Sequence, residues 1–220
     1  LIGQYFKRYR NIPYIFEVGD IWPEAPRQLK DLRNPVLLWL AQYLEKKSYE
    51  GAIALAGLSP DISSYLENAC PGKPVLMLPN VSDTEYFKKE VKDPELEERF
   101  QVKGKFVLSY IGTLGLANNL EYLLDAAAAI PIEANIQIII MGDGARESYL
   151  KNYAHPSAPV RFLPHGSRDE VRNLLNVTDA VFISFQDIPI LATGCPNKLL
   201  DGLASGKLIT LNFRGWIWNL

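Results

Sequence analysis

The 220-residue chain carries 23 basic and 25 acidic side chains, a net charge of −2, and 48% of its residues are hydrophobic. This balance argues against a nucleic-acid-binding protein. The only two histidines exclude a His-rich metal site, and no stretch reaches the roughly 20 apolar residues of a membrane span. Cys70 and Cys195 lie far apart and are expected to be reduced thiols of a cytoplasmic protein, with a single disulfide left open.

Strand-like and helix-like segments alternate over the first 80 residues. The patterns predict helices over 1–10, 34–49 and 60–68, and strands over 14–18, 51–58 and 75–78. Ser59 suits the N-cap of the third helix. The apolar segment 36–44 is expected to be a buried helix. The alternative is a helix that rests on a membrane surface through Trp39 and Tyr43.

A charged segment interrupts this alternation. Residues 81–105 contain few large apolar side chains, a composition typical of an inter-domain connection. We therefore expect a first domain over 1–82, a linker over 83–104 and a second domain over 105–220. Both ends look like cuts through a larger protein, so the first domain and the extreme C-terminus are expected to be incomplete.

The alternation then restarts. The expected strands are 106–111, 136–141, 160–163, 180–184 and 208–212, and the expected helices are 116–129, 145–153, 168–176 and 196–205. Apolar strands without polar alternation indicate parallel sheets covered on both faces. The sequence thus predicts an α/β protein with two doubly wound, Rossmann-like domains.

In such sheets ligands bind beyond the carboxyl ends of the strands. Glycines follow two of the expected strands. Gly112 and Gly115 follow strand 106–111, and Gly142 and Gly144 lie on either side of Asp143 after strand 136–141. The first pair would let backbone amides approach an anion, and the second would contact a base or ribose. The alternatives are ordinary strand-to-helix turns, with Asp143 capping the following helix.

The segment 194–207, GCPNKLLDGLASGK, contains a third loop of this kind. Pro196 suits a first helical position, and Gly206 suits a left-handed helix end. We expect Leu199, Leu200, Leu203 and Ala204 to pack on the sheet. Lys198 and Asp201 share a helix face and could hold a phosphate and a sugar hydroxyl, or could form a surface ion pair.

Two carboxylates, Glu17 and Asp20, follow the first strand on a loop stiffened by Trp22 and Pro23. They are candidates for chemistry. The alternative is a turn or capping role for Asp20 and a partly buried hydrogen bond for Glu17.

Taken in chain order, these motifs resemble those of the retaining GT-B glycosyltransferases of group 1, or family 4, and most of all its bacterial members that build surface polysaccharides. The segments that carry the resemblance are FEVGDIWPE, LSPDISSYL, VLMLPNVSD, YIGTLGLANNLEYLLDAA, IIIMGDGA, RFLPHG and PNKLLDGLASGK.

The resemblance implies transfer of a sugar from a nucleotide-diphosphate sugar, a UDP- or GDP-sugar, with retained configuration and without a metal or other cofactor. The acceptor would be a polysaccharide or lipid-linked saccharide precursor, and the enzyme would be cytoplasmic, with a peripheral contact at the inner membrane face. Catalysis would involve Asp20 or Glu17. Donor binding would involve Gly112, Thr113, Gly115, Gly142, Asp143, Gly144, Asn197, Lys198 and Asp201.

One departure from the family pattern concerns its pair of glutamates, eight residues apart. Asp201 stands for the second glutamate, but Thr193 occupies the position of the first. The alternatives are therefore a nucleotide-binding module without transfer activity and a nucleotide-sugar epimerase of the same architecture. As a fragment, the chain is expected to bind nucleotide weakly and to transfer sugar poorly.

Overall fold

The computed structural model describes residues 2–30 and 32–220, which form two compact units. The first unit contains the chain up to Asn80 together with Asp187–Cys195 and Arg214–Leu220. The second unit contains Val81–Gln186 and Pro196–Phe213. The boundary after Asn80 lies two residues from the expected one. Residues 105–220, expected to be a single domain, instead contribute to both units.

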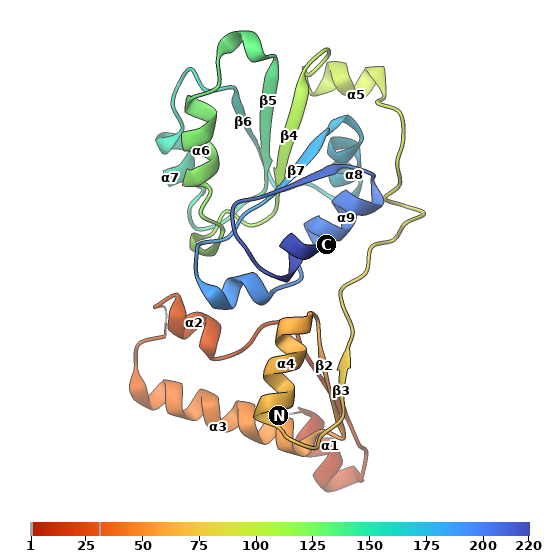
Figure 1. The fold of residues 1–220 in the computed structure, drawn as a ribbon, viewed down its shortest axis with the longest axis vertical. Coiled ribbons are helices and arrows are strands. Elements are labelled where there is room, and N and C mark those ends of the chain that lie inside the picture. Colours follow the sequence, from red (N-terminus) through yellow and green to blue (C-terminus); the bar gives the residue numbers. More distant parts are fainter. Residues whose placement is uncertain (1, 31) are drawn as a thin grey trace. The chain divides into compact units, whose positions relative to one another are not determined.

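The first unit is built on a parallel three-stranded sheet in the order β1-β2-β3 (Figure 1). The strands are β1 (Ile15–Val18), β2 (Ala54–Gly57) and β3 (Val75–Met77), and the helices are α1 (Ile2–Arg10), α2 (Glu24–Gln28), α3 (Pro35–Gly51) and α4 (Pro60–Ala69). A buried cluster that includes Leu55, Ile62 and Leu66 joins α4 to β2. The remaining elements of this unit are the 3₁₀ turns η3 (Pro189–Thr193) and η4 (Trp216–Asn219).

The helix starts in this unit follow the local sequence. The Asn34 side chain accepts hydrogen bonds from the Val36 and Leu37 amides, and Ser59 accepts one from the Ile62 amide at 3.1 Å. Each cap precedes a proline, whose missing N–H costs nothing in a first turn. The predicted Ser59 cap is confirmed.

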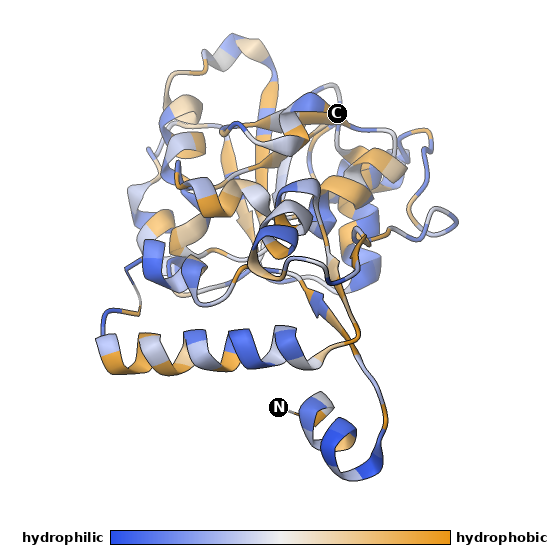
Figure 2. Ribbon diagram, turned by 60° about the horizontal axis from the view of Figure 1, so that its bottom comes forward, coloured by the Kyte–Doolittle hydropathy of each residue, from blue (hydrophilic) through white to orange (hydrophobic). Residues whose placement is uncertain are grey.

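The expected burial of residues 36–44 is wrong. Buried side chains of α3 are confined to Ser48 and Tyr49 within the described part of the chain, and Trp39 is 65% exposed. Figure 2 shows hydrophobic residues along the first half of α3 and hydrophilic ones towards its end. The cause is tertiary, because α3 reaches the core of its unit only through its last turns.

The second unit contains a parallel five-stranded sheet in the order β6-β5-β4-β7-β8. The strands are β4 (Phe106–Ile111), β5 (Ile136–Met141), β6 (Val160–Leu163), β7 (Ala180–Ile183) and β8 (Leu208–Leu211). From β4 the chain first winds outward to β5 and β6, and then returns to β7 on the other side. The order therefore reverses between β4 and β7, the position at which doubly wound sheets bind ligands.

Helices cover both faces of this sheet (Figure 1). The helices α6 (Glu121–Ala128) and α7 (Glu147–Tyr153) share a buried cluster with Ile138 and Ile140. On the opposite face, α5 (Pro94–Arg99) and α8 (Arg168–Val177) lie near a cluster that includes Ile139. Alternate residues of β5 thus enter different cores, which confirms the expected two-sided burial. The helix α9 (Asn197–Ala204) packs on β7 and β8.

The expected linker is an ordered part of the second unit. It contains α5, which packs on α8, and Arg168 lies 4.4 Å from the ring centroid of Tyr86. Arg172 pairs with Glu90 at 3.0 Å. Some of the charges that made this segment look like a linker, Asp83, Glu90 and Arg99, are therefore paired with side chains of α8.

The expected helix over 116–129 is interrupted. A 3₁₀ turn, η1 (Leu116–Asn118), precedes α6, and Asn119 between them has a left-handed backbone with φ of 45°. Asparagine tolerates that region better than most residues. The five strands of this unit match the predicted positions to within a residue, and the predicted parallel α/β fold is confirmed. Within residues 2–30 and 32–220, no helix has the length and apolarity needed to cross a membrane.

Candidate functional site

The second unit has a cavity of about 520 Å³ where β4 and β7 end. Its lining comes from the β4 loop, η1, the loop before α8, α8 itself, β7 and its loop, and the start of α9. The lining residues are Ile111, Gly112, Thr113, Asn118, His165, Val171, Leu175, Val181, Phe185, Pro196, Asn197, Lys198 and Asp201. The predicted residues Gly112, Thr113, Asn197, Lys198 and Asp201 thus meet at one site.

Lys198 provides the positive charge of this cavity. Its Nζ lies 4.0 Å from the centroid of the Tyr110 ring. Among the residues that the structure describes, no carboxylate lies within 4.0 Å of Nζ, so the expected alternative of an ion pair with Asp201 is wrong. Burial lowers the pKa of the Lys198 ammonium to about 7. Burial thus disfavours the charged form, and an anion bound next to Lys198 would favour it again.

Tyr110 is fully buried, and its hydroxyl donates a hydrogen bond of 2.8 Å to the Thr113 carbonyl. This bond fixes the ring against the turn that follows β4. Burial raises the pKa of the Tyr110 phenol, so the ring remains neutral at ordinary pH.

Gly112 makes room for the lysine. Its φ of +145° is rarely adopted by other residues, and a Cβ at this position would lie 2.9 Å from Lys198 Nζ. The glycine predicted to admit a ligand therefore leaves room for the Lys198 ammonium.

The second glycine pair has a different role. Gly142, Gly144 and the exposed Asp143 lie outside the cavity lining, as does Gly115. A Cβ on Gly142 would collide with the Gly112 carbonyl oxygen, and one on Gly144 would lie 2.6 Å from the Leu114 carbonyl oxygen. These glycines let the loops after β4 and β5 pack backbone to backbone.

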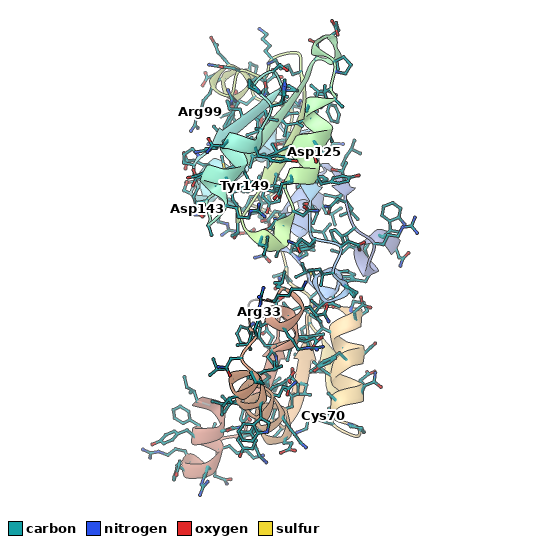
Figure 3. The ribbon with its side chains drawn as sticks, turned by 90° about the vertical axis from the view of Figure 1, so that its left-hand side faces the viewer. Arg33, Cys70, Arg99, Asp125, Asp143 and Tyr149 are labelled. Atoms are coloured by element: carbon teal, nitrogen blue, oxygen red, sulfur yellow. The ribbon has the colours of Figure 1, made fainter. Side chains whose placement is uncertain are left out.

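Hydrogen bonds join the same two loops. The Leu114 amide donates to the Asp143 carbonyl at 2.6 Å, and the Arg146 amide donates to the Leu114 carbonyl at 2.9 Å. Asp143 does not cap α7. The N-cap residue of α7 is Arg146, and no side chain forms a capping hydrogen bond at this helix start. Figure 3 shows Asp143 at the periphery of the second unit.

Asp201 is held by a residue that sequence reasoning missed. The Ser82 hydroxyl donates to Asp201 Oδ1 at 2.7 Å. The sequence pattern also does not single out Asn118 and His165 of the lining, although both stand in motifs that carry the resemblance. The signal available for His165 is its position two residues after the strand that ends at Leu163.

The start of α9 faces the cavity. Pro196 is the residue before the first helical one, not the first as predicted, and no side chain caps the helix. Free backbone amides at such a start favour an anion. At the other end, the predicted left-handed Gly206 is confirmed by its φ of +67°.

The predicted packing stripe of α9 is partly wrong. Leu199 is buried as expected, but Leu203 is 49% exposed. Gly202 faces the sheet instead, where a Cβ would lie 3.0 Å from Ile209 and 3.2 Å from Val181. Glycine at this position allows the helix to approach β7 and β8 closely.

Glu17 and Asp20 lie in the first unit. They line a cavity of about 330 Å³ there and do not line the second-unit cavity. Both are exposed. Nearby, Glu45 accepts hydrogen bonds from the Tyr49 and Tyr65 hydroxyls at 3.0 and 3.2 Å. Burial raises the pKa of the Glu45 carboxyl. Sequence reasoning did not find Glu45.

Thr193 also belongs to the first unit, where its hydroxyl donates to the Ile190 carbonyl at 2.8 Å. Both cysteines are free thiols. Over the described ranges 2–30 and 32–220, no group of three His, Cys, Asp or Glu side chains is arranged to hold a metal ion.

Comparison with protein families gives a match over residues 105–212, to the family described as glycosyl transferases group 1. The match covers just under half of the 220 residues and includes every lining residue of the second-unit cavity. No curated protein matches the chain significantly.

Several solved structures share the fold. Anabaena Alr3699/HepE, in complex with UDP and glucose, aligns at a TM-score of 0.74 and 18% identity over 100% of this chain and 58% of its own. Sucrose-phosphate synthase from Thermosynechococcus elongatus aligns at 0.73 and 13% identity over 96% and 52%. WaaG, a glycosyltransferase involved in lipopolysaccharide biosynthesis, aligns at 0.63 and 15% identity over 91% and 57%.

These similarities confirm the predicted GT-B type of α/β fold. The chain spans 52% to 58% of the length of these three relatives.

Proposed function

We propose that this chain is part of a group 1 glycosyltransferase, and that the cavity of its second unit binds a nucleotide-diphosphate sugar. The family match covers the whole lining of that cavity. A relative of the same fold is described in complex with UDP-glucose. The observation that carries the proposal is the Lys198 ammonium, which lies beside a helix start without a carboxylate partner among the described residues.

The diphosphate interacts with Lys198, the α9 amides and the backbone at Gly112 and Thr113. All these donors line one cavity. Negative charge grows on the diphosphate as the bond to the sugar breaks. A fixed cation and aligned amides stabilise that charge more in the transition state than in the ground state.

Asp201 accepts hydrogen bonds from ribose hydroxyls. Its Oδ1 already accepts the Ser82 hydroxyl, which holds the carboxylate in one orientation and leaves Oδ2 for the ligand. Thr193 stands in place of the first glutamate of the family pair, so Asp201 is the only acidic member of that pair in this chain.

Transfer proceeds with retained configuration and without a metal or other cofactor. The acceptor is a polysaccharide or lipid-linked saccharide precursor, and Glu17 or Asp20 acts on the acceptor side. The enzyme works in the cytoplasm. The exposed Trp39 and Tyr43 on α3 are suited to a peripheral contact at the inner membrane face.

Calorimetric titration of the chain with UDP, GDP and UDP-glucose tests the donor site. We expect Lys198→Ala and Asp201→Ala each to weaken binding by about tenfold or more, as for lost hydrogen bonds to charged groups. Gly104→Ala, at an open turn far from the cavity lining, is the matched control and should bind like the native chain. Unchanged affinity in both site variants would exclude this site.

Transfer itself is tested with the whole protein, UDP- and GDP-sugars and a lipid-linked saccharide. Retained anomeric configuration in the product, measured by NMR, supports the proposal. Asp20→Asn should lower kcat without changing UDP affinity, because Asp20 lies in the other unit. Binding without any transfer would favour a nucleotide-binding module, and conversion of the donor sugar without acceptor would favour an epimerase.

A further inference from the structure

The partner of the Lys198 ammonium is an aromatic face. Lys198 is partly exposed as a residue, but its ammonium is withdrawn from water. Such ammonium groups are normally paired with carboxylates, because an isolated charge is costly to remove from water. Here the Tyr110 ring centroid lies 4.0 Å from Nζ, well within the roughly 6 Å at which a ring attracts a cation.

We propose that Tyr110 is a positioning residue whose buried ring holds the Lys198 ammonium between the carboxyl end of β4 and the start of α9, where the ammonium meets the diphosphate. This inference rests on the proposed function of the cavity. It adds that the affinity of the cavity for the diphosphate depends on Tyr110.

The surroundings of Tyr110 fix both the ring and the ammonium next to it. The Tyr110 hydroxyl is bound to the Thr113 carbonyl, and the side chain is fully buried in a cluster with Ile138 and Ile140. Gly112 leaves open the space that Nζ occupies. The ammonium is thus oriented without being neutralised. A carboxylate in place of the ring would orient it equally well but would repel the ligand.

Protonation of the lysine therefore depends on the ligand. The titratable groups around Lys198 are Tyr110 on β4, Asp201 on α9 and His165 on the loop before α8. Burial lowers the pKa of the ammonium to about 7, and an adjacent diphosphate raises it again. Above pH 7, binding of UDP should accordingly take up a proton.

The first experiment measures UDP affinity by calorimetry in ring variants. Tyr110→Leu should weaken binding roughly threefold to thirtyfold, the range from an exposed to a desolvated cation–π contact. Tyr110→Phe keeps the ring and should stay within about threefold of the native chain. Phe182→Leu is the matched control: Phe182 is buried in the same cluster but lies outside the cavity lining, and its loss should leave affinity unchanged.

A second variant keeps the shape of the ring. Trifluorophenylalanine at position 110 has nearly the volume of phenylalanine but a weaker negative face, so its affinity should fall below that of Tyr110→Phe. Equal affinity of these two proteins, or an equal loss in Phe182→Leu and Tyr110→Leu, would overturn the positioning role.

Proton uptake is measured at pH 8.5 in buffers of different ionisation enthalpy. The native chain should take up close to one proton per UDP, and so should His165→Gln, which removes the imidazole as a source. Lys198→Arg should take up none, because arginine stays charged. Absence of uptake in the native chain refutes the linkage.

If the native chain binds neither UDP nor GDP, the proposed function itself fails. If it binds either nucleotide but the ring variants have no effect, only the role of Tyr110 fails.

Discussion

Ser82 and Asp201 are 119 positions apart, and the Ser82 hydroxyl donates a hydrogen bond of 2.7 Å to the Asp201 carboxylate. The bond joins the segment at the start of the second unit to α9, in the lining of the candidate donor site. The residues directly after the unit boundary therefore contribute to the site.

Ser82→Ala should weaken UDP binding by about twofold to tenfold, less than Asp201→Ala, because it removes one neutral donor and leaves the carboxylate in place. Calorimetry checks this. Ser82→Thr retains the hydroxyl and should restore most of the affinity. A Ser82→Ala protein with native affinity would show that the bond does not orient Asp201.

Gly142→Ala should destabilise the second unit by at least about 3 kcal/mol, because the new Cβ adds a collision with the Gly112 carbonyl to the strain of a positive φ. Gly104→Ala is the control. Its φ is also positive, at +73°, but no atom lies within 4 Å of the new Cβ, so only about 1–2 kcal/mol is expected. Urea unfolding of both variants measures the difference, and equal losses would contradict the packing of the two loops.

Lys198→Met should raise the thermal midpoint of the ligand-free chain most below pH 7. The folded pKa of about 7 lies below the ordinary value of 10.5, so the cost of burying the ammonium is fully present below pH 7. Between these values the folded state releases its proton first, and the native chain regains stability as the pH rises. Each kcal/mol corresponds to about 2–4 °C. Calorimetric scans from pH 6 to 10 should therefore show a shrinking gain, and a constant gain would contradict the assigned titration.

Arg168→Ala should loosen the start of the second unit. Arg168 lies 5.5 Å from the Phe87 ring centroid and pairs with Asp83 at 3.3 Å. These exposed contacts are worth about 1 kcal/mol together, which corresponds to roughly fivefold faster hydrogen exchange. The Phe87 amide, bonded to the Asp83 carbonyl at 2.7 Å, is the amide to follow. Arg168→Lys keeps the charge but not the planar guanidinium, and should show a smaller effect.

The sequence by itself determined the elements and the type of fold. Apolar strands flanked by glycine turns, and caps such as Ser59, depend on interactions within a few residues, and the five strands of the second unit lie where the pattern predicted them. Gly112, Thr113, Asn197, Lys198 and Asp201 could be assigned to one site because parallel strands end at the same edge of a sheet.

Only the tertiary structure decided which groups contact one another. The pairing of Lys198 with Tyr110 and that of Asp201 with Ser82 join segments 88 (198 − 110) and 119 residues apart. No local pattern encodes such contacts, because they depend on how β4, α9 and the start of the unit pack together. The same reason explains Gly142 and Gly144, which local sequence marks as flexible but which packing requires for the close approach of two loops.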